Sequence, residues 1–171
     1  MKPRVYIASS IKHTHGARLL GGELRRLGYS ILDWTEKAIP PPGLTPAQRR
    51  IWMDTDQEGG QVYEFCRNAC VSADLVIYYG ASGQDAGVEI GMAAASGAPV
   101  LGIRGPLEGP GLMLHGAVDA WTEDIGQAIR ILERLAEFFK SGADIAGENE
   151  PGVARLWSRA KERMARQIAK D

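Results

Sequence analysis

The chain has 171 residues, 44% of them hydrophobic and 24% charged, a composition typical of one globular domain with a single core. Its 20 basic and 21 acidic residues leave a formal net charge of -1, which argues against nucleic acid or an anionic membrane as a partner. We therefore expect a small-molecule ligand. The first residues lead directly into a strand-like segment and not into a signal sequence, so we expect a cytoplasmic protein.

The first half of the sequence predicts two short strands around a helix, followed by a long loop. Residues 5–8 form an apolar run, and leucines then recur at helical spacing over residues 20–27 before Gly28, a common helix-ending residue. A second strand is predicted at residues 29–33. The polar stretch at residues 34–60 contains three consecutive prolines, so we interpret it as a long loop that is either a functional lid or partly disordered.

The second half continues the alternation of helices and strands. Apolar runs predict the strands, and glycines and prolines mark the breaks between elements. The predicted order is a helix at residues 62–69, a strand at 73–79, a glycine-rich turn at 80–83, a helix at 85–96, a strand at 99–103, a loop at 105–116, a short edge strand at 117–121 and a core helix at 125–139.

This alternation predicts an α/β fold with a doubly wound parallel sheet. Five short strands suit the flavodoxin-like strand order better than the larger dinucleotide-binding order. We expect one domain over residues 1–140, with its ligand beyond the carboxyl ends of the strands.

Residues 141–171 differ in character and are predicted to form a linker followed by an amphipathic helix. Residues 142–147 are linker-like, and an apolar stripe on a basic helix follows, made of Val153, Leu156, Trp157, Ala160, Met164 and Ile168. We expect this helical extension to pack on the domain or on a second subunit. Its apolar face is narrow, which disfavours the alternative of a helix lying on a membrane surface.

The two cysteines, Cys66 and Cys70, lie four residues apart in a predicted helix and are interpreted as reduced, half-buried thiols. The three histidines show no zinc-type spacing with them. We expect neither a metal nor another cofactor.

The segment from residue 74 to 102 carries the strongest indication of chemistry. A buried strand ends in a glycine-rich turn, and Glu89 follows in the first turns of the next helix. The positive end of that helix favours an ionised, nucleophilic carboxylate, and Gly87 and Gly91 leave room for a sugar. The alternative is that Glu89 is an ordinary acid on a solvated helix.

Three segments closely resemble the nucleoside 2-deoxyribosyltransferase family: Ala73-Asp74-Leu75-Val76-Ile77, Gly87-Val88-Glu89-Ile90-Gly91-Met92-Ala93 and Gly97-Ala98-Pro99-Val100. Tyr6-Ile7-Ala8-Ser9-Ser10 looks like the first strand and sugar-binding turn of that family, and Leu112-Met113 looks like the segment that a neighbouring subunit contributes. The resemblance covers about residues 4–125. It implies a flavodoxin-like fold with a catalytic Glu.

The resemblance further implies a double displacement, in which Glu89 attacks the anomeric carbon of a 2-deoxyriboside and a second base or water resolves the glycosyl ester. Asp74 would contact or help protonate the base, and Tyr6 would lie near Glu89. Each has an alternative: Asp74 as a turn residue and Tyr6 as a core aromatic.

Substrate binding is assigned to the turns at the same edge of the sheet. Ser9 and Ser10 would hold a hydroxyl or a 5'-phosphate, or merely end the first strand, and Ser82 and Gly83 belong to the glycine-rich turn. Met113 would come from a partner, so we expect a homodimer or a higher homo-oligomer.

Two departures from the family pattern concern the sugar's 5' end. Asp85 stands where relatives usually have Gly, and Gly111 lacks the polar side chain usual before Leu112-Met113. Asp85 would bind a hydroxyl and disfavour a phosphate, or only cap the helix.

Aromatic side chains after the second strand offer a wall for a base. Asp33 and Trp34 end that strand and Trp52 follows in the long loop; both tryptophans would stack on the base or would anchor the loop to the core.

The sequence therefore predicts an enzyme that cleaves or transfers the N-glycosidic bond of a deoxynucleoside or deoxynucleotide. One alternative is a glycohydrolase for NAD or another ribosyl compound. The other is a non-catalytic module that senses a nucleotide.

Overall fold

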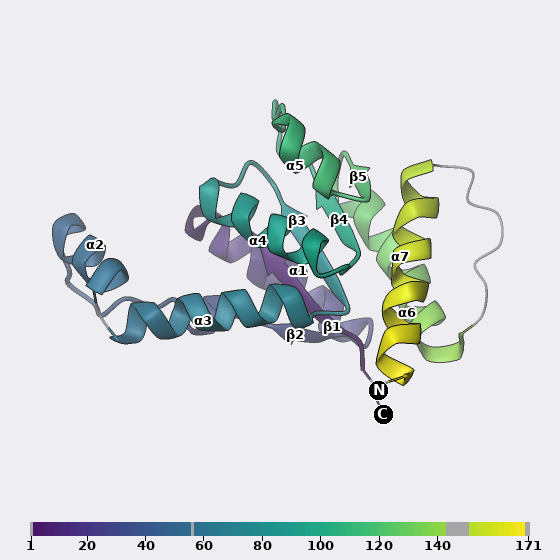
Figure 1. The fold of residues 1–171 in the computed structure, drawn as a ribbon. Coiled ribbons are helices and arrows are strands. Elements are labelled where there is room, and N and C mark those ends of the chain that lie inside the picture. The colour runs from purple at the N-terminus through teal and green to yellow at the C-terminus, as the bar shows by residue number, and fades with distance from the viewer. Residues whose placement is uncertain (1, 56, 143–150, 170–171) are drawn as a thin grey trace.

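A five-stranded sheet, parallel throughout, forms the centre of the computed structural model, which describes residues 2–55, 57–142 and 151–169. The strands lie in the order β2-β1-β3-β4-β5, the flavodoxin-like order that the sequence predicts (Figure 1). Their bounds are β1 Arg4–Ala8, β2 Ser30–Leu32, β3 Leu75–Tyr79, β4 Val100–Ile103 and β5 Ala120–Thr122.

Helices cover both faces of the sheet (Figure 1). One layer holds α1 (Thr14–Arg26) and α6 (Ile125–Ser141), and the other holds α3 (Gln57–Ser72) and α4 (Gln84–Ala95). The remaining elements are the short helices η1 Ile11–His13 and η2 Trp34–Glu36, together with α2 Pro46–Thr55, α5 Leu112–Ala117 and α7 Pro151–Ile168. No helix in the described ranges combines the length and apolarity needed to cross a membrane.

Alternation along the strands divides the core into two clusters, because successive side chains of a strand point to opposite faces. In β1, Val5 and Ile7 pack against α1 and α6, whereas Tyr6 and Ala8 pack on the side of α3 and α4. Tyr6 is fully buried. This register directs the Tyr6 ring toward α4, the helix that carries Glu89.

The prediction of a continuous loop over residues 34–60 is wrong. That stretch contains η2, α2 and the start of α3. Thr45 caps α2: its hydroxyl accepts a hydrogen bond from the Gln48 amide, and the Gln48 side chain accepts one from the Thr45 amide. This reciprocal capping box, with Pro46 at the first helical position, stabilises a helix in a polar segment.

The predicted loop at residues 105–116 and the edge strand at 117–121 are displaced in the structure. Helix α5 begins at Leu112 and β5 begins at Ala120. Asp119 bonds to the start of β4 through two groups: its amide donates to the Val100 carbonyl, and its side chain accepts a hydrogen bond from the Val100 amide. The strand β5 begins at the next residue, three residues later than predicted.

The C-terminal helix α7 packs on the domain beside α6 and β5. Its residues Val153, Leu156, Trp157 and Ala160 are buried in the same cluster as α6. Gly142 ends α6 in the left-handed conformation, with φ of 66°; the rest of the predicted linker, residues 143–150, lies outside the described residues.

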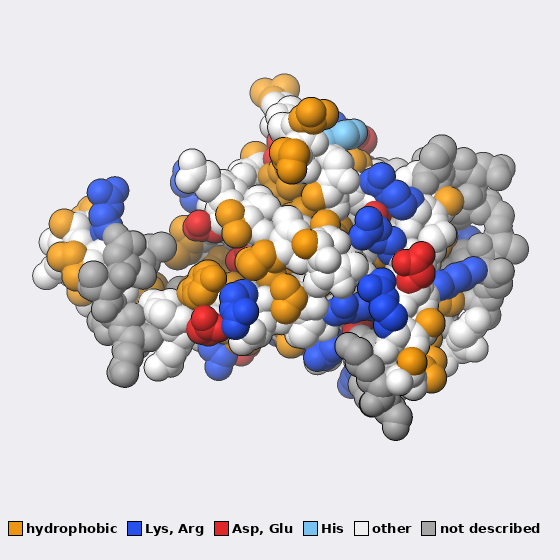
Figure 2. Space-filling view, viewed as in Figure 1, with side chains coloured by type: hydrophobic (Ala, Val, Ile, Leu, Met, Phe, Trp, Pro, Cys, Tyr) orange, Lys and Arg blue, Asp and Glu red, His pale blue; other side chains and the backbone are white. Residues whose placement is uncertain are grey.

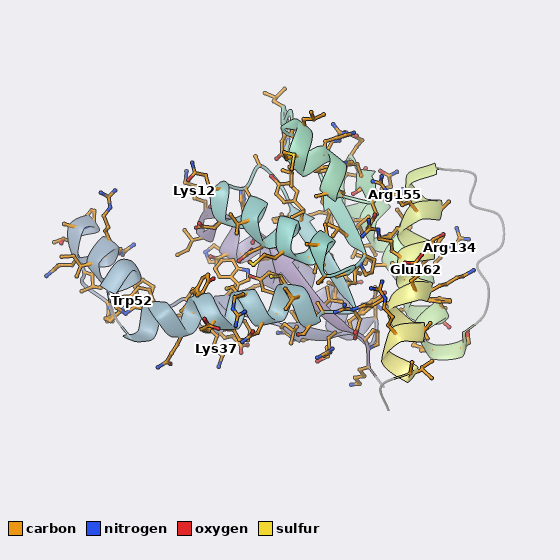
Figure 3. The ribbon with its side chains drawn as sticks, viewed as in Figure 1. Lys12, Lys37, Trp52, Arg134, Arg155 and Glu162 are labelled. Carbon is orange, nitrogen blue, oxygen red and sulfur yellow. The ribbon has the colours of Figure 1, made fainter. Side chains whose placement is uncertain are left out.

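Arginines of α7 contact the carboxyl ends of three other helices, and Lys and Arg side chains gather along this part of the surface (Figure 2). Arg163 donates to the carbonyls of Val71 in α3 and Ser96 at the end of α4. Arg155, labelled in Figure 3, donates to the carbonyl of Val118, which ends α5, and pairs with the buried Asp119. Cations at helix carboxyl ends are stabilising because they oppose the helix dipole.

Candidate active site

A cavity of about 400 Å³ opens beside Glu89. Its walls come from one face of α3, one face of α4, the helix α2 and the turns after β1 and η2. The lining residues are Ile11, Ala38, Pro40, Arg49, Trp52, Gly59, Val62, Tyr63, Cys66, Arg67, Asp85, Val88, Glu89 and Met92. A largely apolar slot with a few polar groups is the usual form of a small-molecule site.

Glu89 lies in the second turn of α4 and is partly buried. The Tyr6 hydroxyl donates a hydrogen bond of 2.7 Å to its Oε1 atom, and Cys66 of α3 lines the same cavity. Glu89 therefore faces the cavity from a fixed position between β1, α3 and α4.

Burial raises the pKa of Glu89 to about 7, opposed by the hydrogen bond from Tyr6 and assisted by the negative charge of Asp85. Burial and the neighbouring Glu89 charge also raise the pKa of Tyr6 far above its usual range. Tyr6 therefore stays protonated and donates. A carboxyl group whose pKa lies near neutrality is suited to act as a nucleophile or base near pH 7.

Asp85 and Trp52 both line the cavity. Asp85 lies in the first turn of α4, where Gly83 and not Asp85 occupies the N-cap position. Trp52 is buried on α2 at the side of α3 (Figure 3). Asp85 is thus placed to contact a ligand, and Trp52 offers an aromatic wall.

Ser9, Ser10 and Ser82 lie together at the carboxyl edge, next to the cavity residue Ile11. The Ser82 hydroxyl accepts a hydrogen bond from the Ser10 amide at 2.9 Å and donates to the Tyr79 carbonyl. The Ser10 hydroxyl caps η1, and the Ser9 hydroxyl is buried with no protein partner in the described part of the chain. Hydrogen bonds therefore fix the side chains of Ser10 and Ser82, and the Ser9 hydroxyl is left to bind a ligand.

The structure does not bring Asp74 to the cavity, where the sequence-based expectation placed it. Asp74 precedes β3 and therefore lies at the amino edge of the sheet, opposite the edge where the cavity opens. Its carboxylate accepts the Arg4 amide at 2.6 Å and pairs with the Arg4 guanidinium. These contacts join β1 to β3 at the far end of the sheet.

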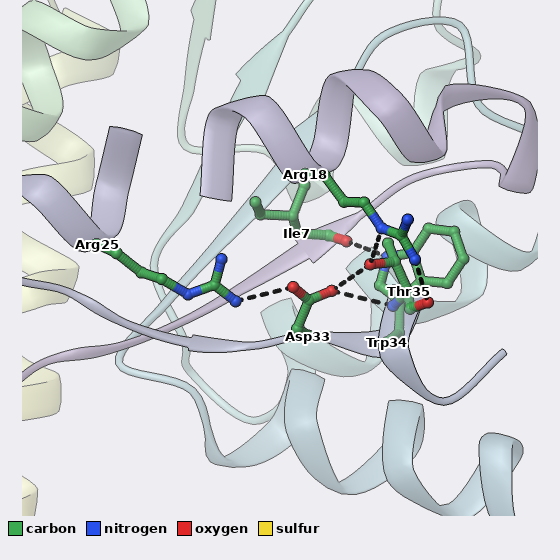
Figure 4. Close-up of polar contacts among 6 residues, drawn as sticks. All are labelled: Ile7, Arg18, Arg25, Asp33, Trp34 and Thr35. Carbon is green, nitrogen blue, oxygen red and sulfur yellow. Dashed lines mark hydrogen bonds and ion pairs between the residues drawn. The ribbon is translucent and has the colours of Figure 1, made fainter. Parts of the chain in front are cut away.

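Asp33 and Trp34 also lie outside the cavity lining and serve the η2 turn (Figure 4). Asp33 caps η2 and pairs with Arg25 at 2.9 Å. The Trp34 indole is buried and donates to the Ile7 carbonyl at 2.9 Å. Of the two alternatives for Trp34, this geometry favours the anchor.

Gly87 and Met113 stand in open surroundings. A Cβ atom added at Gly87 would meet no other atom within 4 Å, so space remains on that side of α4. Met113 is 87% exposed on α5, next in sequence to the exposed Leu112, and hydrophobic side chains gather at this protruding part of the surface in Figure 2. Met113 does not reach the cavity of its own chain.

Several lining residues lie outside the sequence prediction, above all Cys66, with Arg49, Tyr63, Arg67 and Met92. Positions 59, 62, 63, 66 and 67 share one face of α3, so their spacing alone could have grouped them. Both cysteines are free thiols. Among the residues described, no three His, Cys, Asp or Glu side chains gather in a way that would hold a metal ion.

Comparison with known proteins supports the fold. No protein-family model matches the chain, and no curated protein matches it significantly in sequence. A 2-deoxyribosyltransferase from Bacillus psychrosaccharolyticus has a similar structure, with a TM-score of 0.50 and 22% identity over 73% of this chain and 89% of that one.

Two further solved structures show weaker similarity. A CMP N-glycosidase from Clostridium botulinum gives a TM-score of 0.49 at 16% identity, over 77% of this chain and 97% of its own. A phosphorylated cyanobacterial phytochrome response regulator gives 0.44 at 12% identity, over 86% and 100%.

Proposed function

We propose that the protein cleaves or transfers the N-glycosidic bond of a 2-deoxynucleoside or deoxynucleotide, with Glu89 as the nucleophile. The observation that carries the proposal is the Glu89 carboxylate, held by Tyr6 at 2.7 Å and facing an apolar cavity. The proposal agrees with the activity named for the 2-deoxyribosyltransferase of similar fold.

The reaction has two displacements. A carboxylate oxygen of Glu89 attacks the anomeric carbon, the bond to the base nitrogen breaks, and the base leaves with the electron pair and takes a proton from water. A second base or a water molecule then attacks the same carbon and releases Glu89. The nearby anion stabilises the positive charge that develops on the sugar in both transition states.

A panel of substrates tests this function. Purified protein is incubated with nucleosides, their 5'-monophosphates and NAD, with and without an acceptor base, and free base is followed by chromatography. Base release from a deoxyriboside supports the proposal. Release from NAD alone would identify a ribosyl glycohydrolase, and binding without release from any compound would identify a sensing module.

We expect the active form to be at least a dimer, because Leu112 and Met113 are 86% and 87% exposed on α5 and exposed apolar clusters mark interaction sites. Met113→Glu should dissociate the oligomer and lower activity. Leu19→Glu is the matched control, since Leu19 is 78% exposed on α1. Light scattering measures the mass, and a fully active wild-type monomer would refute this expectation.

Asp85→Gly should change selectivity at the 5' end of the sugar more than the rate of the chemical step. Asp85 lines the cavity four residues before Glu89, and its charge repels a phosphate at short range. The ratio of kcat/KM for a nucleoside to that for its 5'-monophosphate should fall severalfold. An unchanged ratio would leave Asp85 as a first-turn helix acid only.

A further inference from the structure

We propose that Tyr78 and Glu108 are positioning residues, which hold the turn of residues 80–83 and, through it, the serines expected to bind the substrate. The functional part of this inference rests on the proposed function, because these serines matter to catalysis only if a nucleoside binds beside them. Tyr78 is fully buried near the end of β3, and Glu108 lies between β4 and α5. Neither side chain lines the cavity, so both would act through other residues.

The hydroxyl of Tyr78 joins two separate segments of the chain. It donates a hydrogen bond to the Oε1 atom of Glu108 and accepts one of 3.1 Å from the Ser82 amide. A phenol hydroxyl both donates and accepts, so one atom holds both segments. Burial, assisted by the hydrogen bond to Glu108, raises the pKa of Tyr78 to about 12. The hydroxyl therefore stays protonated at neutral pH and keeps both contacts.

Glu108 in turn closes a tight turn over residues 105–108. Its Oε2 atom accepts a hydrogen bond of 2.8 Å from the Gly105 amide, and its own amide donates to the Gly105 carbonyl at 3.1 Å. Leu107, inside this turn, has a φ of 63°, a left-handed conformation that is unfavourable for a residue other than glycine. Such a conformation persists where the surrounding contacts fix it. Glu108 supplies these contacts from both its side chain and its backbone.

The turns of residues 105–108 and 80–83 approach each other backbone to backbone. A Cβ atom added at Gly105 would lie 2.5 Å from the nitrogen of Ala81, so the approach requires glycine at this position. On its other side, the second turn meets the serines, because the Ser82 hydroxyl accepts a hydrogen bond of 2.9 Å from the Ser10 amide. A continuous set of contacts therefore runs from the first turn to Ser10.

The same contacts fix the start of α4, the helix that carries Glu89. Gly83 is its N-cap and has no side chain to cap the helix, so the contacts of Ser82 hold the chain just before it. Without the Tyr78 hydroxyl, the turn and the nearby Ser9 hydroxyl should fluctuate more. Ordering them on binding would then reduce affinity. Once substrate is bound, the attack by Glu89 should proceed at nearly its normal rate.

The test compares Tyr78→Phe with Tyr79→Phe, a control that removes a hydroxyl lying against Gly16 on the opposite face of the sheet. Hydrogen exchange of the Ser82 amide is measured by NMR without substrate. In Tyr78→Phe it should be about tenfold faster, as expected for one lost hydrogen bond. In Tyr79→Phe it should match the wild type.

The second measurement separates KM from kcat, with the deoxyriboside that releases base fastest. Tyr78→Phe should raise KM about fivefold and change kcat by less than about twofold, because the loss concerns ordering before the chemical step. Glu108→Ala should also raise KM. The double variant should resemble the single variants, since effects along one set of contacts are not additive.

Unchanged exchange of the Ser82 amide in Tyr78→Phe, or equal changes in Tyr79→Phe, would overturn the proposal. So would a fall in kcat with KM unchanged, or additive effects in the double variant, which would leave Tyr78 and Glu108 as packing residues. The exchange measurement needs no turnover. It therefore decides whether Tyr78 holds the turn even if no deoxyriboside proves to be a substrate and the proposed function fails.

Discussion

Replacement of Glu89 by alanine is expected to abolish base release while the protein stays folded and still binds substrate. Without the carboxylate no glycosyl ester forms, and the anion that stabilises the transition state is lost as well. The combined loss should lower kcat by on the order of 10⁴-fold or more. Binding should survive, because the remaining cavity residues, largely apolar, are unchanged.

Turnover by chromatography and substrate affinity by calorimetry measure these two effects separately. Mass spectrometry of wild-type protein with a slow 2-fluoro substrate should find a deoxyribosyl adduct on Glu89. Asp85→Ala, which removes another carboxylate lining the cavity, is the control and should still form the adduct. Base release by Glu89→Ala near the wild-type rate would refute the mechanism.

Replacement of Glu89 by glutamine is expected to stabilise the protein above neutral pH. The pKa of Glu89 is about 7 in the folded protein, against roughly 4.3 for an unfolded glutamate. Ionisation of Glu89 is therefore harder in the folded state, and this cost to stability is absent below about pH 4 and complete above about pH 7. It amounts to roughly 3 kcal/mol at pH 8.

Glutamine removes this cost and keeps an acceptor for the Tyr6 hydroxyl. Urea unfolding at pH 8 should show the variant more stable than the wild type by about 3 kcal/mol, and at pH 4 the two should agree. Glu137→Gln, at a side chain 71% exposed on α6, is the control and should change little, since surface charges contribute little to stability. Equal stabilities of Glu89→Gln and wild type at both pH values would contradict the burial of Glu89.

Much of the architecture could be predicted because the strands are uninterrupted apolar runs between glycine-rich turns. Helix α2 could not be found by hydrophobic periodicity, since its residues before Trp52 are exposed; its signal is the capping pair of Thr45 and Gln48. Sequence reasoning placed Glu89 at the ligand edge because it follows β3. The same logic applied to Asp74, which precedes β3, would have placed it at the opposite edge.

The partners of Glu89 were harder to predict. Alternation along β1 assigns Tyr6 to one face of the sheet but does not say which helix covers that face. In α3, Ala69 and Cys70 are buried in the core and Cys66 lines the cavity, a division set by how α3 rotates against α4. A periodic pattern identifies the faces of a helix, and tertiary packing decides what each face meets.

The arginine contacts of α7 bear on the order in which the protein assembles on the ribosome. Glu89 and Tyr6, with the elements that carry them, are synthesised well before residues 151–168, so the edge of the sheet that holds the cavity can form while α7 is still being made. The contacts at the opposite edge form only after α7 is made. They join Arg155, Arg159 and Arg163 to the carboxyl ends of α3, α4 and α5 and to the buried Asp119. The nascent chain can therefore assemble the surroundings of Glu89 before the arginine contacts of α7 form.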